Sequence, residues 1–306
     1  MTKILISEVG PRDGLQSIDR VMSLDAKKAW IKAEAEAGVR EIEVGSFVPP
    51  SLLPQLADTA EVVAFAKTIP GLNVVTLVPN IKGAMRAAQC GVHGMSIPFS
   101  MSETHSIKNV RKDHPAMIAE ISGIAKLADA AGIHFAVSLS TAFGCTIEGN
   151  VPEDRVVRLA EAAVSAGAKE LSLSDTTGYA DPAQVKRLVR KVKAAVGADV
   201  LTTLHLHNTR GLGLANVLAG LEEGITTFDA SLGGIGGCPF APGASGNIVT
   251  EDLVFMLQAM GLETGIDLER LLKVRDIVAA ALPGEQLYGF TPDAGLPLDF
   301  AQRAAQ

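Results

Sequence analysis

The chain has 306 residues, of which 47% are hydrophobic and 20% charged, and its formal net charge at pH 7 is -7. This composition is typical of a well-packed globular protein and excludes a disordered or fibrous chain, while the negative charge argues against nucleic acid or an anionic membrane as the main partner. The cysteines number three and are scattered, and neither a leader peptide nor an apolar stretch of about 18 residues is found. We therefore expect a protein of the reducing cytoplasm that is neither exported nor embedded in a membrane.

Short β-branched runs recur along the chain and predict eight strands, over residues 3–9, 41–45, 73–79, 94–99, 134–140, 170–175, 200–207 and 226–232. Each run is followed by a stretch rich in alanine and leucine with helical periodicity, for example residues 24–38 and 152–167. Several of these stretches end in glycine, as helices often do. Strict alternation predicts parallel strands joined by helical crossovers, and eight repeats suit a closed (β/α)8 TIM barrel. An open doubly wound sheet is the alternative, but the GxGxxG turn typical of that fold does not follow the first strand.

The pattern changes from about residue 263. One more helix is expected over 267–282, and a segment rich in proline and glycine follows it. This part is too short to build its own core. We therefore expect a catalytic barrel over residues 1–262 and a C-terminal helical and extended appendage over 263–306, not an independent domain.

Two histidines, His205 and His207, stand on alternate positions at the end of the seventh predicted strand. Alternate residues of a strand face the same side. Asp13 follows the first strand, and in a closed barrel strands one and seven both flank strand eight. A mixed set of nitrogen and oxygen ligands with open positions suits Mg²⁺ or Mn²⁺, with Zn²⁺ as the lesser alternative. The other interpretation is that the histidines are ordinary polar side chains at a strand end and that Asp13 caps a helix or holds a turn.

Further polar residues follow other predicted strands. Arg12 is either a surface residue or, beside a metal, a partner for an anion or enolate. Asp175 ends the sixth strand, and a glycine-rich loop over 233–247, long enough for a mobile lid, contains Cys238. Cys238 is either reactive or a bystander, because no basic residue adjacent to it in sequence lowers its pKa. Asn109 lies in a segment expected to be a loop, where it either contacts the substrate or is simply solvated.

Three segments together, "VGPRDGLQ" (9–16), "IEVGSFVPPSLLPQLAD" (42–58) and "GGIGGCPFAPGASGNIVTEDLV" (233–254), resemble the 3-hydroxy-3-methylglutaryl-CoA lyase family, and the similarity spans residues 5 to about 260. The resemblance implies a divalent-metal-dependent retro-Claisen cleavage of 3-hydroxy-3-methylglutaryl-CoA to acetyl-CoA and acetoacetate, and a homodimer or higher homo-oligomer. It also implies the following roles: metal ligands Asp13, His205, His207 and Asn247; enolate stabiliser Arg12; acidic groups Glu43 and Asp175; a residue near the product, Cys238; and a catalytic base, either His205 or a water held by Asp175.

The chain departs from the family pattern after the second histidine, where it has Asn208, Arg210 and Leu212 in place of the residues of HxHDTYGQ. Arg210 adds a cation near the expected substrate, and Gln16 of the first motif is a second expected substrate contact. These departures leave the acyl group of the acyl-CoA substrate open. The alternatives are a lyase for another 3-hydroxyacyl-CoA, a synthase that condenses acetyl-CoA with a 2-oxo acid, and a barrel kept only for binding.

Overall fold

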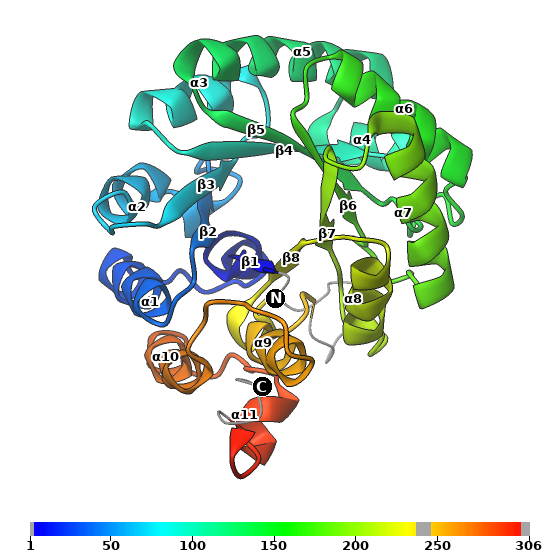
Figure 1. Cartoon of the computed structure of the whole chain (residues 1–306). Coiled ribbons are helices and arrows are strands. Elements are labelled where there is room, and N and C mark those ends of the chain that lie inside the picture. The colour runs from blue at the N-terminus through cyan, green and yellow to red at the C-terminus, as the bar shows by residue number, and fades with distance from the viewer. Residues whose placement is uncertain (1–2, 237–245, 301–306) are drawn as a thin grey trace.

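The structure is a computed structural model that describes residues 3–236 and 246–300. Parallel strands pair in chain order until β1 meets β8, so the sheet closes into a barrel with helices around it (Figure 1). This confirms the predicted (β/α)8 barrel and rules out the open sheet. The strands are β1 Leu5–Glu8, β2 Glu41–Ser46, β3 Asn73–Leu77, β4 Gly94–Ser100, β5 His134–Ser140, β6 Glu170–Ser174, β7 Leu201–His205 and β8 Thr227–Ala230.

The helices follow the predicted alternation. They are α1 Leu24–Glu36, α2 Thr59–Ala66, α3 Ile81–Cys90, α4 Glu103–Val110, α5 His114–Ala131, α6 Glu153–Ser165, α7 Pro182–Val196, α8 Gly213–Glu222, α9 Thr250–Ala259, α10 Leu268–Ala281 and α11 Phe290–Ala294, with short turns η1 Gly10–Gly14, η2 Pro54–Leu56 and η3 Leu232–Gly234. Local chemistry sets many of their ends. Ser23 accepts a hydrogen bond from the Ala26 amide at the start of α1, and Gly91 and Gly132 adopt left-handed conformations after α3 and α5.

Alternation along the strands separates an apolar outer layer from a polar interior. In β5, Phe135, Val137 and Leu139 are buried within the hydrophobic core. Ser138, on the other face, shares a hydrogen bond of 2.7 Å with Ser174 of β6. Barrel interiors are usually filled by branched apolar side chains. Small hydroxyl side chains here leave a polar surface beneath the carboxyl ends of the strands.

The C-terminal part packs on the barrel beside α1 (Figure 1). The amide of Asp267, which caps α10, donates to the carbonyl of Ala37 at 2.7 Å, and Leu271 and Val274 of α10 are buried in the same core as the strands. The division at residue 263 stays a prediction. None of the helices in the described ranges is long and apolar enough to cross a bilayer.

Candidate metal centre and active site

The turn η1 brings two charged side chains to the carboxyl end of β1. After β1, the carbonyl of Val9 accepts hydrogen bonds from the amides of Arg12 (3.1 Å) and Asp13 (2.6 Å), which fold the chain into one wide turn. Glycine is required at position 10, because a Cβ atom there would lie 2.5 Å from Oε1 of Glu8. The turn therefore fixes the positions of Arg12 and Asp13 relative to the end of β1.

Asp13, His205 and His207 form a cluster in which one ligand atom of each lies within 4.8 Å of the others. The Nε2 atoms of the two histidines are 3.1 Å apart, and His205 Nε2 is 4.0 Å from Asp13 Oδ2. Asn247 forms an isolated bridge with His207, and its Nδ2 donates to Asp13 Oδ2 at 2.8 Å. The expectation that β1 and β7 bring these groups together across β8 therefore agrees with the strand order.

The donor set fits a divalent cation. Two nitrogens 3.1 Å apart match adjacent ligands of an octahedral ion bound at about 2.1 Å, whose donors are about 3 Å apart. Asn247 Oδ1 and His207 Nδ1 are buried and have no hydrogen-bond partner among the described residues. A buried polar oxygen without a partner is costly, and a cation would satisfy the Asn247 oxygen.

Electrostatics favour the metal-binding forms of two of these groups. Burial alone would raise the pKa of Asp13, but the charge of Arg12 and then those of the two histidines outweigh it and hold that pKa well below its usual range. Burial, followed by the charge of His205, lowers the pKa of His207 to about 4. Asp13 is therefore ionised and His207 neutral near pH 7, which are the forms that bind metal ions.

Arg12 is fixed between two carboxylates. Its Nε donates to Glu43 Oε2, and its Nη1 lies 2.5 Å from Asp13 Oδ1. Glu43 is itself held by the Ser96 hydroxyl at 2.8 Å. Burial would lower the pKa of Arg12, but the charges of Glu43 and Asp13 raise it, so the guanidinium stays charged. The pairing of Arg12 with Glu43, which the sequence did not predict, thus creates a preorganised cation next to Asp13.

Asp175 lies buried at the end of β6. Its two carboxylate oxygens accept the amides of Tyr179 (2.8 Å) and Ala180 (3.2 Å), and its own amide donates to the carbonyl of His205. Burial raises the pKa of Asp175 to about 6 against these hydrogen bonds. The carboxyl group is therefore rigidly held beside the strand that carries the histidines.

The expected substrate contacts lie in different settings. Gln16 donates to Asp13 Oδ1 at 2.8 Å. The guanidinium of Arg210 lies over the ring of Tyr179 at 4.6 Å and donates to the carbonyls of Thr177 and Gly178. The prediction that Asn109 lies in a loop is wrong. Asn109 lies on the helix α4, which Ser102 caps by accepting from the His105 amide. Its side chain is exposed.

Cys238 lies outside the described residues, as does most of the glycine-rich loop, 237–245. The structure reveals two carboxylates that the sequence did not single out. Asp229 of β8 lies 3.1 Å from Nδ1 of His205, and Glu8 of β1 is fully buried behind η1. The available signal was that each is the only charged residue of its strand.

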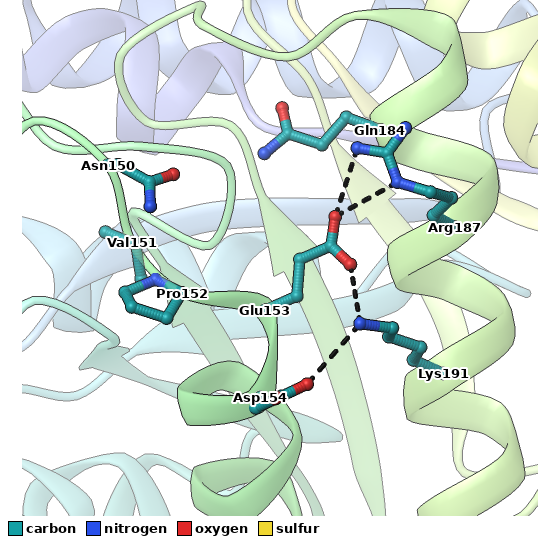
Figure 2. Close-up of a pocket in the computed structure, with 8 residues that line it drawn as sticks. All are labelled: Asn150, Val151, Pro152, Glu153, Asp154, Gln184, Arg187 and Lys191. Carbon is teal, nitrogen blue, oxygen red and sulfur yellow. Dashed lines mark hydrogen bonds and ion pairs between the residues drawn. The ribbon is translucent and has the colours of Figure 1, made fainter.

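A separate pocket lies between the N-terminal ends of α6 and α7 (Figure 2). Its acidic and basic side chains pair with one another, since Glu153 contacts both Arg187 (3.2 Å) and Lys191 (2.9 Å). Lys191 also contacts Asp154 at 3.4 Å. Because these charges are mutually neutralised and no residue of the metal cluster lines this pocket, we do not place the chemistry there.

The chain is similar to known proteins over most of its length. The model of the family described as HMGL-like matches residues 3–278. The chain is 40% identical over 292 residues to the hydroxymethylglutaryl-CoA lyase YngG of Bacillus subtilis, covering 94% of this chain and 97% of that protein. It is also 40% identical over 305 residues to the (R)-citramalyl-CoA lyase of Chloroflexus aurantiacus, covering 96% of each chain. A solved HMG-CoA lyase from Acinetobacter baumannii, in complex with coenzyme A and 3-methylmalate, superposes with a TM-score of 0.90 at 41% identity, covering 97% of this chain and 96% of that one.

Proposed function

The chain belongs to the HMGL-like family, and from this premise we infer that it is a carbon–carbon lyase that cleaves 3-hydroxy-3-methylglutaryl-CoA to acetyl-CoA and acetoacetate. The observation that carries the inference is the cluster of Asp13, His205 and His207 at the carboxyl end of a closed barrel. This is where (β/α)8 enzymes carry their catalytic groups. The relatives are lyases, which favours cleavage over the condensing synthase and over a barrel kept for binding.

We propose that Asp13, His205, His207 and Asn247 hold a divalent cation, Mg²⁺ or Mn²⁺ before Zn²⁺. Carboxylate and amide oxygens combined with imidazoles suit these ions, and thiolates, which would favour zinc, are absent from the described part of this cluster. When bound, such an ion polarises the substrate oxygens that it contacts and lowers the pKa of the substrate hydroxyl.

The reaction moves one proton from the tertiary hydroxyl and returns one to carbon. The hydroxyl proton passes to a base, either His205 or a water held by Asp175, while the bond between the α and β carbons breaks. Its electron pair leaves as the enolate of acetyl-CoA. Arg12 uses Nε and Nη1 on Glu43 and Asp13, so its Nη2 donors are available for the enolate oxygen. Protonation of the α carbon then completes acetyl-CoA, and Cys238 or a water is the proposed donor.

Three further residues are proposed as substrate contacts. We propose that Gln16, already bonded to Asp13, orients the acyl group, and that Arg210 and Asn109 contact the CoA portion of an acyl-CoA substrate. The homo-oligomeric state, homodimer first, and a cytoplasmic location follow only from the family resemblance and the composition. Both remain predictions.

A second substrate deserves a direct test, because a relative named (R)-citramalyl-CoA lyase is as similar to this chain as the hydroxymethylglutaryl-CoA lyase. Citramalyl-CoA has the same hydroxyl- and methyl-bearing carbon, but its carboxylate is one methylene closer. Asn208 directly follows His207 in the chain and departs from the family pattern, so we propose it as a position that distinguishes the two acyl groups. Cleavage of citramalyl-CoA would release pyruvate in place of acetoacetate.

The decisive experiment is a panel of 3-hydroxyacyl-CoA thioesters assayed with added Mg²⁺ for acetyl-CoA and for the second product. Acetoacetate from 3-hydroxy-3-methylglutaryl-CoA supports the first substrate, and preferential release of pyruvate from citramalyl-CoA replaces it with the second. Free CoA released from acetyl-CoA and 2-oxo acids would instead identify a synthase. Dialysis against a chelator should abolish cleavage and Mg²⁺ or Mn²⁺ should restore it, so full activity of the chelated protein rejects the metal site.

A further inference from the structure

Asp229 is a carboxylate of the barrel interior that the reaction scheme does not use. It lies in β8, directly beside His205 in the register of β7 and β8. Its Oδ2 is 3.1 Å from Nδ1 of His205, and both side chains are largely shielded from solvent, with 18% and 11% exposed. Within the described part of the chain, this imidazole is the only hydrogen-bond partner found for the Asp229 carboxylate.

The hydrogen bond between His205 and Asp229 has a defined donor and acceptor. A carboxylate accepts hydrogen bonds, so Nδ1 of His205 must carry the proton that is shared with Asp229. In a neutral imidazole the lone pair is then on Nε2. Nε2 is the atom that faces Asp13 Oδ2 at 4.0 Å and His207 Nε2 at 3.1 Å. Asp229 therefore lies across the ring from the proposed cation and is not one of its ligands.

The two histidines differ in the partner of their Nδ1 atoms. His205 is held from behind by Asp229, whereas Nδ1 of His207 is buried without a partner among the described residues. The structure thus provides a carboxylate anchor for one imidazole of the pair. Such a carboxylate behind a metal-binding histidine fixes its tautomer and ring orientation and increases its basicity as a ligand.

We propose that Asp229 is a positioning residue that fixes His205 as a permanent metal ligand, with Nδ1–H on Asp229 and Nε2 turned to the cation. This role of Asp229 rests on the metal site of the proposed function. It also decides between the two candidate bases, which are His205 and the water held by Asp175. With both ring nitrogens engaged, His205 has no nitrogen left to accept the hydroxyl proton. The acceptor is then the water held by Asp175.

The test measures metal binding in the absence of substrate. We expect Asp229→Ala to weaken Mn²⁺ binding, measured by calorimetry, by about 10- to 100-fold, and Asp229→Asn to weaken it less because its amide oxygen can still accept from Nδ1. Glu41→Gln is the matched control. Glu41 is a carboxylate of β2, bonded to Asn73 and close enough to Asp229 for their charges to interact. This control should leave the Mn²⁺ affinity within about twofold if the direct contact to His205, and not the total charge of the interior, is what matters.

A second readout does not depend on the metal. In metal-free protein with ¹⁵N-labelled histidine, at a pH where the ring is neutral, long-range ¹⁵N spectra should show His205 with its proton on Nδ1, and Asp229→Ala, which removes the acceptor, should shift the population towards Nε2–H. Unchanged tautomers together with Mn²⁺ affinity of Asp229→Ala within twofold of wild type would overturn the assignment. Failure of the wild type to bind Mn²⁺ would overturn the metal site itself, and the tautomer would still decide the role of Asp229. If Asp229→Ala does not fold, the wild-type spectrum still decides, because a neutral His205 with its proton on Nε2 would overturn the assignment.

Discussion

Replacement of Glu8 by glutamine is expected to remove a large pH dependence of folding stability. Glu8 is fully buried behind the turn that carries Arg12 and Asp13. Its Oε1 accepts the amides of Gly10 (2.8 Å) and Leu232 (2.9 Å), and its Oε2 contacts the Thr250 hydroxyl at 2.7 Å. One carboxyl group thus joins the segments after β1 and β8 and the start of α9.

Burial raises the pKa of Glu8 from 4.5 to about 8, although its hydrogen bonds to Thr250, Leu232 and Gly10 act in the opposite direction. The folded protein therefore keeps a proton that the unfolded chain releases above pH 4.5. Stability must fall as pH rises between these values, with a slope of at most about 1.4 kcal/mol per pH unit from this one group. A glutamine side chain can keep the two amide contacts and cannot ionise, so it should abolish this loss.

Denaturant unfolding of wild type and Glu8→Gln at pH 5.5, 6.5, 7.5 and 8.5 measures the effect. The difference in unfolding free energy should grow in favour of the variant as pH rises and level off above about pH 8. Glu269→Gln, at an exposed position of α10, is the matched control and should follow wild type. Parallel pH profiles for wild type and Glu8→Gln would show that Glu8 is not held neutral in the folded protein.

Arg12→Gln should lower kcat by about 10²- to 10³-fold, because it removes a preorganised donor to the enolate, and steady-state kinetics within about threefold of wild type would contradict this role. Gly10→Ala should destabilise the fold by about 1–3 kcal/mol through its contact with buried atoms, whereas Gly123→Ala, whose Cβ would meet its nearest atom at 3.8 Å, should be neutral or stabilising in the same melts. Arg210→Ala should raise KM for the acyl-CoA substrate and cost at most about 1 kcal/mol of stability, because its stacking on Tyr179 is at an exposed site; an unchanged KM removes it from the substrate site.

The fold could be predicted because its signal is local and repeated. β-branched runs, helical periodicity and terminal glycines each depend on neighbouring residues, and their alternation leaves few topologies. Several predicted strands ran slightly long, whereas β2 and β4 each extend one residue beyond the prediction. The first was expected over 3–9 but ends at Glu8, because the Val9 carbonyl already accepts the amides of the following turn.

The site was only partly predictable. Asp13, His205 and His207 were found because strand alternation and barrel closure place them at the same end of β1 and β7, the two strands that flank β8. Asp229 gave no comparable signal, because its significance depends on one contact to a residue 24 positions away, through the register of β7 and β8. A sequence pattern gives the face of a strand more readily than its exact register.

The charges at the carboxyl ends of the strands explain why two of the proposed metal ligands are imidazoles. Asp13, Glu43 and Asp229 place three carboxylates close enough to the guanidinium of Arg12 for their charges to interact with it. Buried like charges repel strongly, so a further carboxylate ligand would add to an excess that Arg12 alone cannot balance. Neutral imidazoles supply two strong donor atoms without adding negative charge, and a divalent cation supplies the positive charge that the carboxylates lack. The excess of negative charge around Asp13, His205 and His207 therefore favours metal binding.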